Sequence, residues 1–546
     1  MDHPAVQERL RKLTPDQHAA ATAPPGPVLC VAPAGSGKTT TLVARIAWLV
    51  DGGADPATIA AITFNKRAAE ELGERAEAAL APLGVGPGLV RVRTFHALGR
   101  EILGDAGRSV EPLVDRTELF AELFPRTSLA ERGRLDTAFS RLKLDLAVSG
   151  DDVAADPDAG PVAQAFVAYE RALEERAALD FDDLVRRALD VLGADASTLD
   201  RWRRRCTHLL VDEVQDVDRS QLRLALLLAA PQNRIFLVGD DDQSIYGWRL
   251  ADVRRVLAIG EALPGLRRVD LEVNHRCPAP VVERAVRLIG HNQERFDKVI
   301  RPRAEAPGAV VLAPDADDEP ERTERLLRSW PDDDGTRAVL ARTNRELRPG
   351  VVAAMDLGMA FRAPSVELLV DDPRLDPLLT RLDEETSPAL PLLVRIGQFR
   401  SSLPVEGWLD RELASAILSW APPYRDLPTF RAAIEATRAR LAELRRDDAR
   451  LSLATAHSTK GAEFDHVAVV GMEEGRFPSG RAVAEAEDPG RAYEEERRLG
   501  YVAWTRARRT LTLSYDPAVP SPFLLEAFAP EELGLEATST SVPGSG

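Results

Sequence analysis

The sequence predicts an α/β protein built on parallel β-sheets. Short apolar runs such as PVLCV at 27–31, THLLV at 207–211 and RIFLVG at 234–239 end directly in glycine-rich or acidic segments. Such runs are typical of parallel strands that are covered on both faces. They alternate with helical patterns in both halves of the chain, as expected of an α/β fold. A chain of 546 residues is long enough for several domains.

Composition and charge exclude several classes of protein. Hydrophobic residues make up 44% and charged residues 29%, which is ordinary for a soluble globular protein. The longest apolar run, Leu224–Ala230, is far too short for a membrane helix, and the polar N-terminus lacks the apolar stretch of a signal peptide. The three cysteines form no CxxC pair, which removes a disulfide scaffold and a zinc ribbon. We therefore expect a soluble, cytoplasmic protein that binds no membrane.

The charge pattern carries two further signals. A net charge of −17 argues weakly against a passive nucleic-acid coat, but it allows a groove that grips nucleic acid with a few residues. Only six of the 70 basic residues are lysine. A GC-rich coding bias explains this scarcity, although a lysine that persists can also mark a place where a compact ammonium is needed.

The first chemical motif is a glycine-rich turn between an apolar run and an amphipathic segment. Residues 32–39 read APAGSGKT, which fits the P-loop pattern. Successive backbone N–H groups before a helix N-terminus bind phosphate, Lys38 would reach the β- and γ-phosphates, and Thr39 would hold Mg²⁺. The predicted phosphate cradle consists of Ala34, Gly35, Ser36, Gly37, Lys38, Thr39 and Thr40.

A pair of carboxylates supplies the second half of this site. The apolar run at 207–211 ends in Asp212 and Glu213. Asp212 can hold Mg²⁺, and Glu213 can orient the attacking water. Alone, such a pair is a common surface loop. Together with Lys38 it predicts hydrolysis of a nucleoside triphosphate.

Further blocks occur in order along nearly the whole chain. They are TPDQ at 14–17, ITFN at 62–65, TFH at 94–96, DFDDL at 180–184, VDEVQD at 211–216, VGDDDQSIYGWR at 238–249, NHR at 274–276, ARTN at 341–344, HSTKGAEF at 457–464 and EERRLGYVAWTRA at 495–507. With these blocks the sequence resembles the UvrD/Rep/PcrA family of superfamily 1 DNA helicases. The resemblance implies two RecA-like P-loop domains that bind ATP and Mg²⁺ between them.

The resemblance also implies roles for residues outside the P-loop. Gln17 would read adenine, Gln243 would sense the γ-phosphate, and Glu463 would hold the ribose. Arg276 and Arg506 occupy the two arginine-finger positions, where a cation stabilises the charge that develops in phosphoryl transfer. For either arginine taken alone, an ordinary surface position is the alternative.

A second set of residues is predicted to contact DNA. Binding of single strands without sequence preference uses aromatic platforms for the bases and polar or basic contacts to the phosphates. Phe64, Tyr246 and Trp248 are the aromatic candidates, with packing in the core as the alternative for each. The polar and basic candidates are His96, Arg249, Arg342, Asn344 and His457.

Motif spacing predicts the domain plan. Lys38 and Asp212 are 174 residues apart, which predicts a helical insertion between them. We assign 1–104 and 186–270 to the first RecA-like domain, 105–185 to its mainly helical insertion, 271–374 and 448–530 to the second RecA-like domain, 375–447 to a reduced helical insertion, and 531–546 to a flexible tail.

Several departures from the family pattern bear on function. His275 replaces a tyrosine that often stacks on adenine, and Thr40 replaces a frequent arginine, so base selectivity could be looser. The segment after Arg506 leaves little room for the hairpin that splits duplexes in relatives.

The resulting hypothesis is an ATP-dependent single-strand DNA translocase and 3′-to-5′ helicase that serves DNA repair or recombination. Its partners would be single-stranded or tailed duplex DNA and, in addition, a nuclease or repair protein. One alternative is a motor subunit of a nuclease or phage-defence complex that unwinds weakly alone. The other is a nucleotide switch that is independent of DNA.

Overall fold

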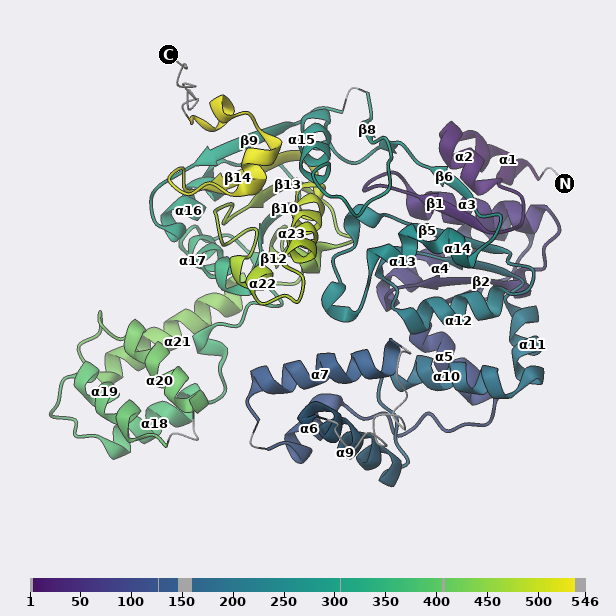
Figure 1. Ribbon diagram of the computed structural model, residues 1–546. Helices are drawn as coiled ribbons and strands as arrows, with labels where there is room; N and C mark the ends of the chain where they lie inside the picture. Colours follow the sequence, from purple (N-terminus) through teal and green to yellow (C-terminus); the bar gives the residue numbers. More distant parts are fainter. Residues whose placement is uncertain (1–2, 126, 146–159, 305, 405–407, 536–546) are drawn as a thin grey trace, which may run out of the picture. The chain divides into compact units, whose positions relative to one another are not determined.

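The computed structural model describes residues 3–125, 127–145, 160–304, 306–404 and 408–535. The chain forms two compact units (Figure 1). Unit 1 comprises Met1–Ala306 and Glu494–Tyr501, and unit 2 comprises Pro307–Tyr493 and Val502–Gly546. Residues 271–306 thus pack with unit 1, whereas the motif spacing assigned them to the second domain. Most of the predicted tail lies outside the described residues.

Unit 1 is built on a parallel sheet of six strands in the order β3-β2-β4-β5-β1-β6. The strands are β1 (Val28–Val31), β2 (Ile59–Thr63), β3 (Arg91–Thr94), β4 (His208–Val211), β5 (Ile235–Gly239) and β6 (Arg267–Asp270). Val28 and Cys30 of β1 face one apolar core, and Leu29 and Val31 face another. Because both faces are covered, the inner strands β1, β2, β4 and β5 are buried along their whole length, whereas the edge strands β3 and β6 carry arginines.

Helices cover both faces of this sheet. One core contains α1 (Pro4–Arg11), α2 (Pro15–Ala21), α3 (Lys38–Asp51) and α4 (Lys66–Leu80). The other contains α5 (Phe95–Asp105), α10 (Asp183–Ala194), α11 (Ala196–Arg205), α12 (Arg219–Ala229), α13 (Val253–Leu257) and α14 (Ile259–Ala262). Unit 1 also contains α15 (Ala279–Ile289) and the short parallel pair β7 (Val273–Asn274) and β8 (Arg301–Pro302).

The segment between α5 and α10 forms a helical insertion with its own core. Its helices are α6 (Arg116–Leu123), α7 (Leu129–Leu144) and α9 (Pro161–Glu175). The rings of Phe120, Phe139, Phe166 and Tyr169 pack edge to face or tilted, with centroids 5.2 to 5.5 Å apart. Such aromatic geometry stabilises a small core beyond the area it buries.

A buried ion cluster also ties the insertion together. The Nζ atom of Lys143 lies 2.7 Å from a carboxylate oxygen of Glu170, 2.9 Å from one of Asp180 and 3.0 Å from one of Asp183. Arg116 pairs with Asp180 at 2.6 Å. The cluster joins residues of α7 and α9 to the start of α10.

Unit 2 contains a second parallel sheet of six strands in the order β11-β12-β10-β13-β14-β9. The strands are β9 (Ala309–Pro314), β10 (Arg337–Ala341), β11 (Phe361–Arg362), β12 (Leu451–Thr455), β13 (Phe464–Val469) and β14 (Ala507–Tyr515). The accompanying helices are α16 (Glu319–Ser329), α17 (Arg348–Asp356), α22 (Gly480–Ala484) and α24 (Pro522–Ala527). Helix α23 (Pro489–Trp504) is divided between the units, because its residues Glu494–Tyr501 belong to unit 1.

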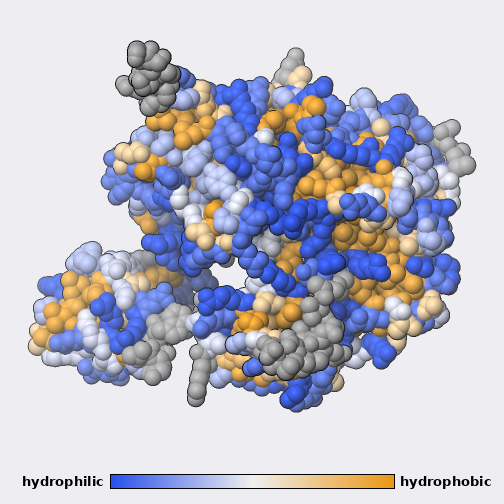
Figure 2. All heavy atoms as spheres, in the orientation of Figure 1, coloured by the Kyte–Doolittle hydropathy of each residue, from blue (hydrophilic) through white to orange (hydrophobic). Residues whose placement is uncertain are grey.

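A four-helix insertion shares the core of this sheet. It consists of α18 (Leu375–Glu385), α19 (Leu392–Ser402), α20 (Trp408–Trp420) and α21 (Leu427–Leu444). On the face shown in Figure 2, apolar side chains gather over α19, where Leu393 and Val394 are 41% and 43% exposed. Within the described residues, no helix is both long and apolar enough to cross a bilayer. The predicted fold class, an α/β protein with parallel sheets and helical insertions, is confirmed.

Candidate nucleotide and DNA sites

The phosphate loop lies between β1 and α3. Gly35 and Gly37 adopt φ values of +68° and +86°, in the region that favours glycine. A Cβ atom added to Gly35 would lie 2.7 Å from Cβ of Arg276, and one added to Gly37 would lie 2.5 Å from Nε2 of Gln17. The hydroxyl of Ser36 is buried and has no hydrogen-bond partner among the described residues. The loop therefore has the backbone conformation and the spare donor that an anion cradle needs.

Gln17 lies directly against this loop. Its Nε2 atom donates to the carbonyl oxygen of Ser36 at 2.8 Å, and its Oε1 atom accepts from the backbone N–H of Thr14 at 3.1 Å. Both ends of the amide are thus engaged with backbone groups in this conformation. A role in reading adenine stays a prediction.

The carboxylates after β4 face the loop lysine. Nζ of Lys38 lies 3.6 Å from Oε2 of Glu213, which also accepts a hydrogen bond of 2.6 Å from Nε2 of Gln215. Glu213 has a left-handed φ of 51°, a backbone conformation that residues other than glycine rarely adopt. Gln215 stands in the VDEVQD block but was not among the predicted site residues. The structure places it as the group that holds Glu213.

Asp212 is buried at the end of β4. Burial raises the pKa of its carboxyl to about 7, and the neighbouring Glu213 carboxylate reinforces the shift while Lys38 opposes it. An added cation would relieve this accumulation of negative charge. Thr39, half-buried in the first turn of α3, is the second predicted Mg²⁺ ligand.

Arg276 and its neighbours pack against the phosphate loop. The backbone N–H of His275 donates to the carbonyl oxygen of Gly35 at 2.9 Å. Oδ1 of Asn274 accepts from the backbone N–H groups of Arg276 and Cys277, both at 2.8 Å. The structure therefore brings one predicted arginine finger next to the loop. The loop threonine Thr40 accepts a hydrogen bond of 3.1 Å from Arg75 of α4.

Gln243 contacts the acidic segment that follows β5. It lies in the turn η4 (Asp241–Gln243) after β5, and its Nε2 atom donates to Oδ2 of Asp240 at 2.7 Å. Lys38 is among the cations that lower the pKa of Asp240. The backbone N–H of Asp240 donates to Oε1 of Gln215 at 3.0 Å. Within unit 1, Asp240 thus connects Gln243 to Gln215, and Gln215 in turn contacts Glu213, the ion-pair partner of Lys38.

Lys298, which was not among the predicted site residues, neutralises the three aspartates that follow β5. The side chain of Lys298 is 1% exposed, and its Nζ atom lies 2.8 Å from Oδ1 of Asp240 and 3.0 Å from Oδ2 of Asp242, with Asp241 as a third partner. Arg295 pairs with Asp242 through two hydrogen bonds of 2.8 and 3.0 Å. Burial alone would lower the pKa of Lys298, but the three carboxylates raise it well above its usual value.

The predicted aromatic platform forms a continuous ring cluster. Phe64 and Tyr246 stack with centroids 5.2 Å apart and planes 15° apart, and Trp248 contacts Tyr246 edge to face at 6.2 Å. Trp248 is 57% exposed, and Arg249 lies over its ring at 5.0 Å. Burial raises the pKa of Tyr246 to about 12, with contributions from the nearby carboxylates of Asp216 and Glu213. An exposed indole beside a guanidinium suits base stacking.

His96 belongs to a second ring pair. Its imidazole stacks on Phe181 with centroids 4.0 Å apart, and Phe181 is 56% exposed. Burial lowers the pKa of His96 to about 4, so this imidazole is neutral near pH 7. Phe181 was not among the predicted contact residues, although it stands in the DFDDL block. The sequence did contain a signal for Phe181, namely an aromatic residue placed between Asp180 and Asp182.

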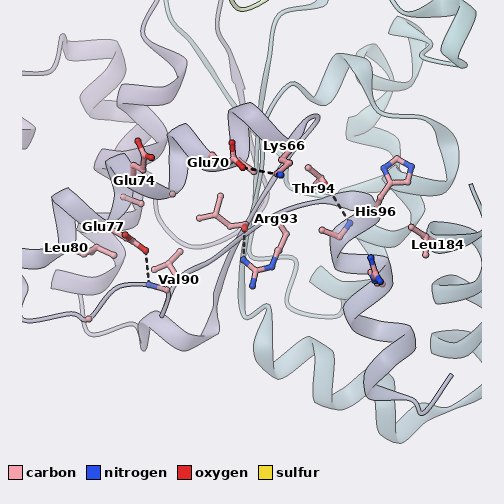
Figure 3. Close-up of a pocket in the computed structure, with 18 of the residues that line it drawn as sticks. Lys66, Glu70, Glu74, Glu77, Leu80, Val90, Arg93, Thr94, His96 and Leu184 are labelled. Carbon is pink, nitrogen blue, oxygen red and sulfur yellow. Dashed lines mark hydrogen bonds and ion pairs between the residues drawn. The ribbon is translucent and has the colours of Figure 1, made fainter. Parts of the chain in front are cut away.

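Both rings line a cavity of about 660 Å³ beside the edge strand β3. Figure 3 shows Glu74 and Glu77 of α4 on one side of this cavity and His96 and Leu184 on the other. The cavity therefore adjoins the predicted DNA surface of unit 1 rather than the phosphate loop.

Unit 2 places its predicted DNA contacts at the ends of neighbouring strands. Arg342 and Asn344 follow β10, and His457 follows β12, which pairs with β10 up to Ala341 and Thr455. Burial lowers the pKa of His457 to about 4, and Arg342 and Lys460 contribute. The three side chains thus share one edge of the second sheet.

The other two predicted nucleotide contacts also lie in unit 2. Arg506 is buried, and its guanidinium donates to the carbonyl oxygens of Val502 at 2.8 Å and Ala462 at 3.1 Å. Glu463 pairs with Arg508. In this conformation Arg506 is held by its own unit, and its role as a finger stays a prediction.

These features define unit 1 as a P-loop nucleoside triphosphatase domain with an exposed aromatic surface near Asp216 and Glu213. Comparison with known proteins extends this class to a family. The profile of the UvrD/REP helicase N-terminal domain matches residues 13–264, and that of the UvrD-like helicase C-terminal domain matches residues 424–517.

Named relatives agree over most of the chain. The ATP-dependent DNA helicase UvrD2 of Mycobacterium tuberculosis is 31% identical over 92% of this chain and 78% of its own length. DNA helicase II of Escherichia coli is 27% identical over 93% of this chain and 85% of its own length. The chain therefore belongs to the UvrD-like helicase family of ATP-driven DNA helicases, and the predicted family and enzyme class are confirmed.

Proposed function

We propose that the protein is a single-strand DNA translocase that moves 3′ to 5′, unwinds duplex DNA and serves DNA repair or recombination. The proposed coupling of ATP hydrolysis to DNA binding rests on one observation. The segment from Asp240 to Arg249 contains Gln243 near one end. Near the other end it contains Tyr246, which stacks on Phe64, and Trp248, which contacts Tyr246 edge to face. Tyr246 follows Gln243 by only three residues. A movement of Gln243 when the γ-phosphate is lost therefore also moves the ring that is proposed to contact the bases. The polarity and the pathway rest on the family resemblance.

In the proposed hydrolysis, Lys38 leaves Glu213 and reaches the β- and γ-phosphates. The freed Glu213 carboxylate, still held by Gln215, orients the attacking water and accepts its proton. Arg276 lies beside the phosphate loop, where its cation can stabilise the developing charge. The family resemblance assigns Arg506 the same role, which requires its guanidinium to leave the carbonyl oxygens of Val502 and Ala462.

The residues present also suit Mg²⁺. A threonine hydroxyl and a buried carboxylate are hard oxygen donors of the kind this ion takes in phosphate sites. Thr39 and Asp212 would hold Mg²⁺, which would neutralise charge on the β- and γ-phosphates. Ser36 offers its buried hydroxyl to a phosphate oxygen.

The test is the steady-state ATPase rate with and without single-stranded DNA, with Lys38→Ala as the blank. We expect strong stimulation by DNA and no activity in the blank. Duplexes with a 3′ or a 5′ single-stranded tail then test polarity, and unwinding from the 3′ tail alone is expected. A rate that DNA does not change would instead indicate a nucleotide switch.

A further outcome concerns partners and location. Strong DNA stimulation without strand separation would favour the motor subunit of a nuclease or phage-defence complex. In that case a nuclease or repair protein should restore unwinding when it is added. A cytoplasmic location is part of the same proposal, because the substrate is cellular DNA.

A further inference from the structure

The loop that carries Lys298 is held from two sides within unit 1. On one side Lys298 and Arg295 contact the aspartates that follow β5. On the other side Glu494 of α23 accepts from the backbone N–H of Gln293 at 2.7 Å, and Arg497 of α23 donates to Oδ1 of Asn292 at 2.6 Å. Hydrogen bonds from α23 therefore hold the start of this loop in addition to the ion pairs that Lys298 and Arg295 make.

Asp240 is the carboxylate through which Lys298 can act on the reaction. Its Oδ1 atom contacts Lys298 and its Oδ2 atom accepts from Gln243. Its backbone N–H donates to Gln215, which in turn holds Glu213. One residue thereby links a buried cation to both the predicted γ-phosphate sensor and the predicted water-orienting carboxylate.

A lysine suits this place better than an arginine. An ammonium carries three donors on a compact head that can reach three carboxylates converging on one point, whereas a guanidinium spreads five donors over a larger planar fork. Lys298 has three carboxylate partners, and its side chain is 1% exposed. The chain otherwise uses arginine almost exclusively, and Arg295 takes the two-bond contact to Asp242 for which its shape is suited.

We propose that Lys298 is a positioning residue for ATP hydrolysis, which fixes Asp240 so that Gln243 and Gln215 are held in the geometry that hydrolysis requires. The proposal rests on the proposed ATPase function and adds a residue outside the motifs. Without Lys298 the three buried carboxylates repel one another, Asp240 moves, and the amide of Gln243 loses its fixed acceptor. Lys298 itself touches no substrate.

The test compares Lys298→Met with Lys143→Met. Lys143 is a matched control, because it is equally buried and also faces three carboxylates, but in the helical insertion. Basal ATP hydrolysis without DNA is measured on folded protein, together with the affinities for ATP and ADP. We expect kcat of Lys298→Met to fall about 10- to 100-fold, since small misplacements of catalytic groups have effects of this size. KM should change less than threefold, the preference for ATP over ADP should shrink, and Lys143→Met should keep the wild-type kcat.

A double-mutant cycle separates positioning from general stability. If Lys298 acts through Gln243, the variant that combines Lys298→Met with Gln243→Ala should hydrolyse ATP no more slowly than Gln243→Ala alone. Independent, multiplicative losses would overturn the proposal, as would a folded Lys298→Met with wild-type kcat.

Asp240→Asn provides the test if Lys298→Met does not fold. It keeps the volume of the side chain and leaves Lys298 two carboxylate partners, so the protein should fold. A slow kcat that is again not additive with Gln243→Ala is expected, and an unchanged kcat would overturn the proposal. Wild-type hydrolysis that DNA does not stimulate would count against the proposed DNA motor alone, because this test reads basal hydrolysis. A wild-type protein without ATPase activity would refute both.

Discussion

Replacing Lys143 by methionine should selectively destabilise the helical insertion of unit 1. Lys143 is fully buried with ion-pair contacts of 2.7, 2.9 and 3.0 Å to three carboxylates. At an effective dielectric constant of about 20, each contact is worth on the order of 6 kcal/mol before desolvation. Desolvation offsets most of this, and removing one partner from a buried ion pair has a net cost of about 3 to 5 kcal/mol. Arg116 remains as a cation, which places the expected loss at the lower end of that range.

Hydrogen exchange is the suitable assay, because a chain with two units does not unfold in a single two-state step. Local opening of α7 and α9 sets the exchange rate of their amides. A loss of about 3 to 5 kcal/mol corresponds to exchange that is roughly 100- to 4,000-fold faster, at about 1.4 kcal/mol for each factor of ten. Peptides from the sheet of unit 2 should keep their wild-type rates.

Lys66→Met is the matched control for the loss of one lysine charge. Lys66 is 88% exposed with one 3.7 Å contact to Glu70. Exposed pairs of this kind contribute about 0.5 kcal/mol or less, so exchange should change less than threefold. If Lys143→Met left exchange in α7 and α9 within threefold of wild type, the reasoning that the cluster depends on this cation would be refuted.

Three further predictions follow from single sites. Gly37→Ala should weaken nucleotide binding at least tenfold, because the new Cβ would lie 2.5 Å from Gln17 Nε2 at a φ of +86°. Gly84→Ala is the control, because Gly84 has a φ of +75° with open space around it. Equal affinities of the two variants in a nucleotide titration would contradict the cradle geometry. Trp248→Ala should weaken single-strand DNA binding by about 1 to 3 kcal/mol, which fluorescence anisotropy measures; an affinity within twofold of wild type would exclude base stacking there. Burial lowers the pKa of His96 to about 4, so the folded protein binds this proton more weakly than the unfolded chain and stability falls as pH drops from about 6.5 toward 4. The unfolding midpoint of His96→Gln should fall less steeply over that range, and parallel curves would count against the assignment.

The sheets and the strand-end motifs could be predicted because their signals are local. An apolar run of four or five residues that is buried on both faces looks the same in sequence wherever it occurs, and β1, β4 and β5 lie where such runs were found. The glycines of the phosphate loop mark a backbone conformation that other residues rarely adopt. Both signals need only a few neighbouring residues.

The interactions that hold the motifs in place could not be predicted, since their partners are distant in sequence. Gln17 contacts Ser36 across 19 residues, and Lys298 contacts Asp240 across 58. Arg506 was predicted as a finger from its motif, but its present hydrogen bond to the carbonyl oxygen of Ala462 spans 44 residues. No local pattern records these distances.

A signal for Lys298 was nevertheless present in the composition. Three consecutive aspartates after an apolar strand are costly to bury unless a cation from elsewhere neutralises them. Asp240, Asp241 and Asp242 are each at most 1% exposed, so such a cation is a physical requirement of the fold. In a chain with only six lysines, a lysine outside every motif is the natural candidate when three acceptors converge on one point. The same argument applies to Lys143 in the insertion. Lys143 and Lys298 both lie outside the motifs, and their side chains are at most 1% exposed. Each neutralises carboxylates that would otherwise repel one another.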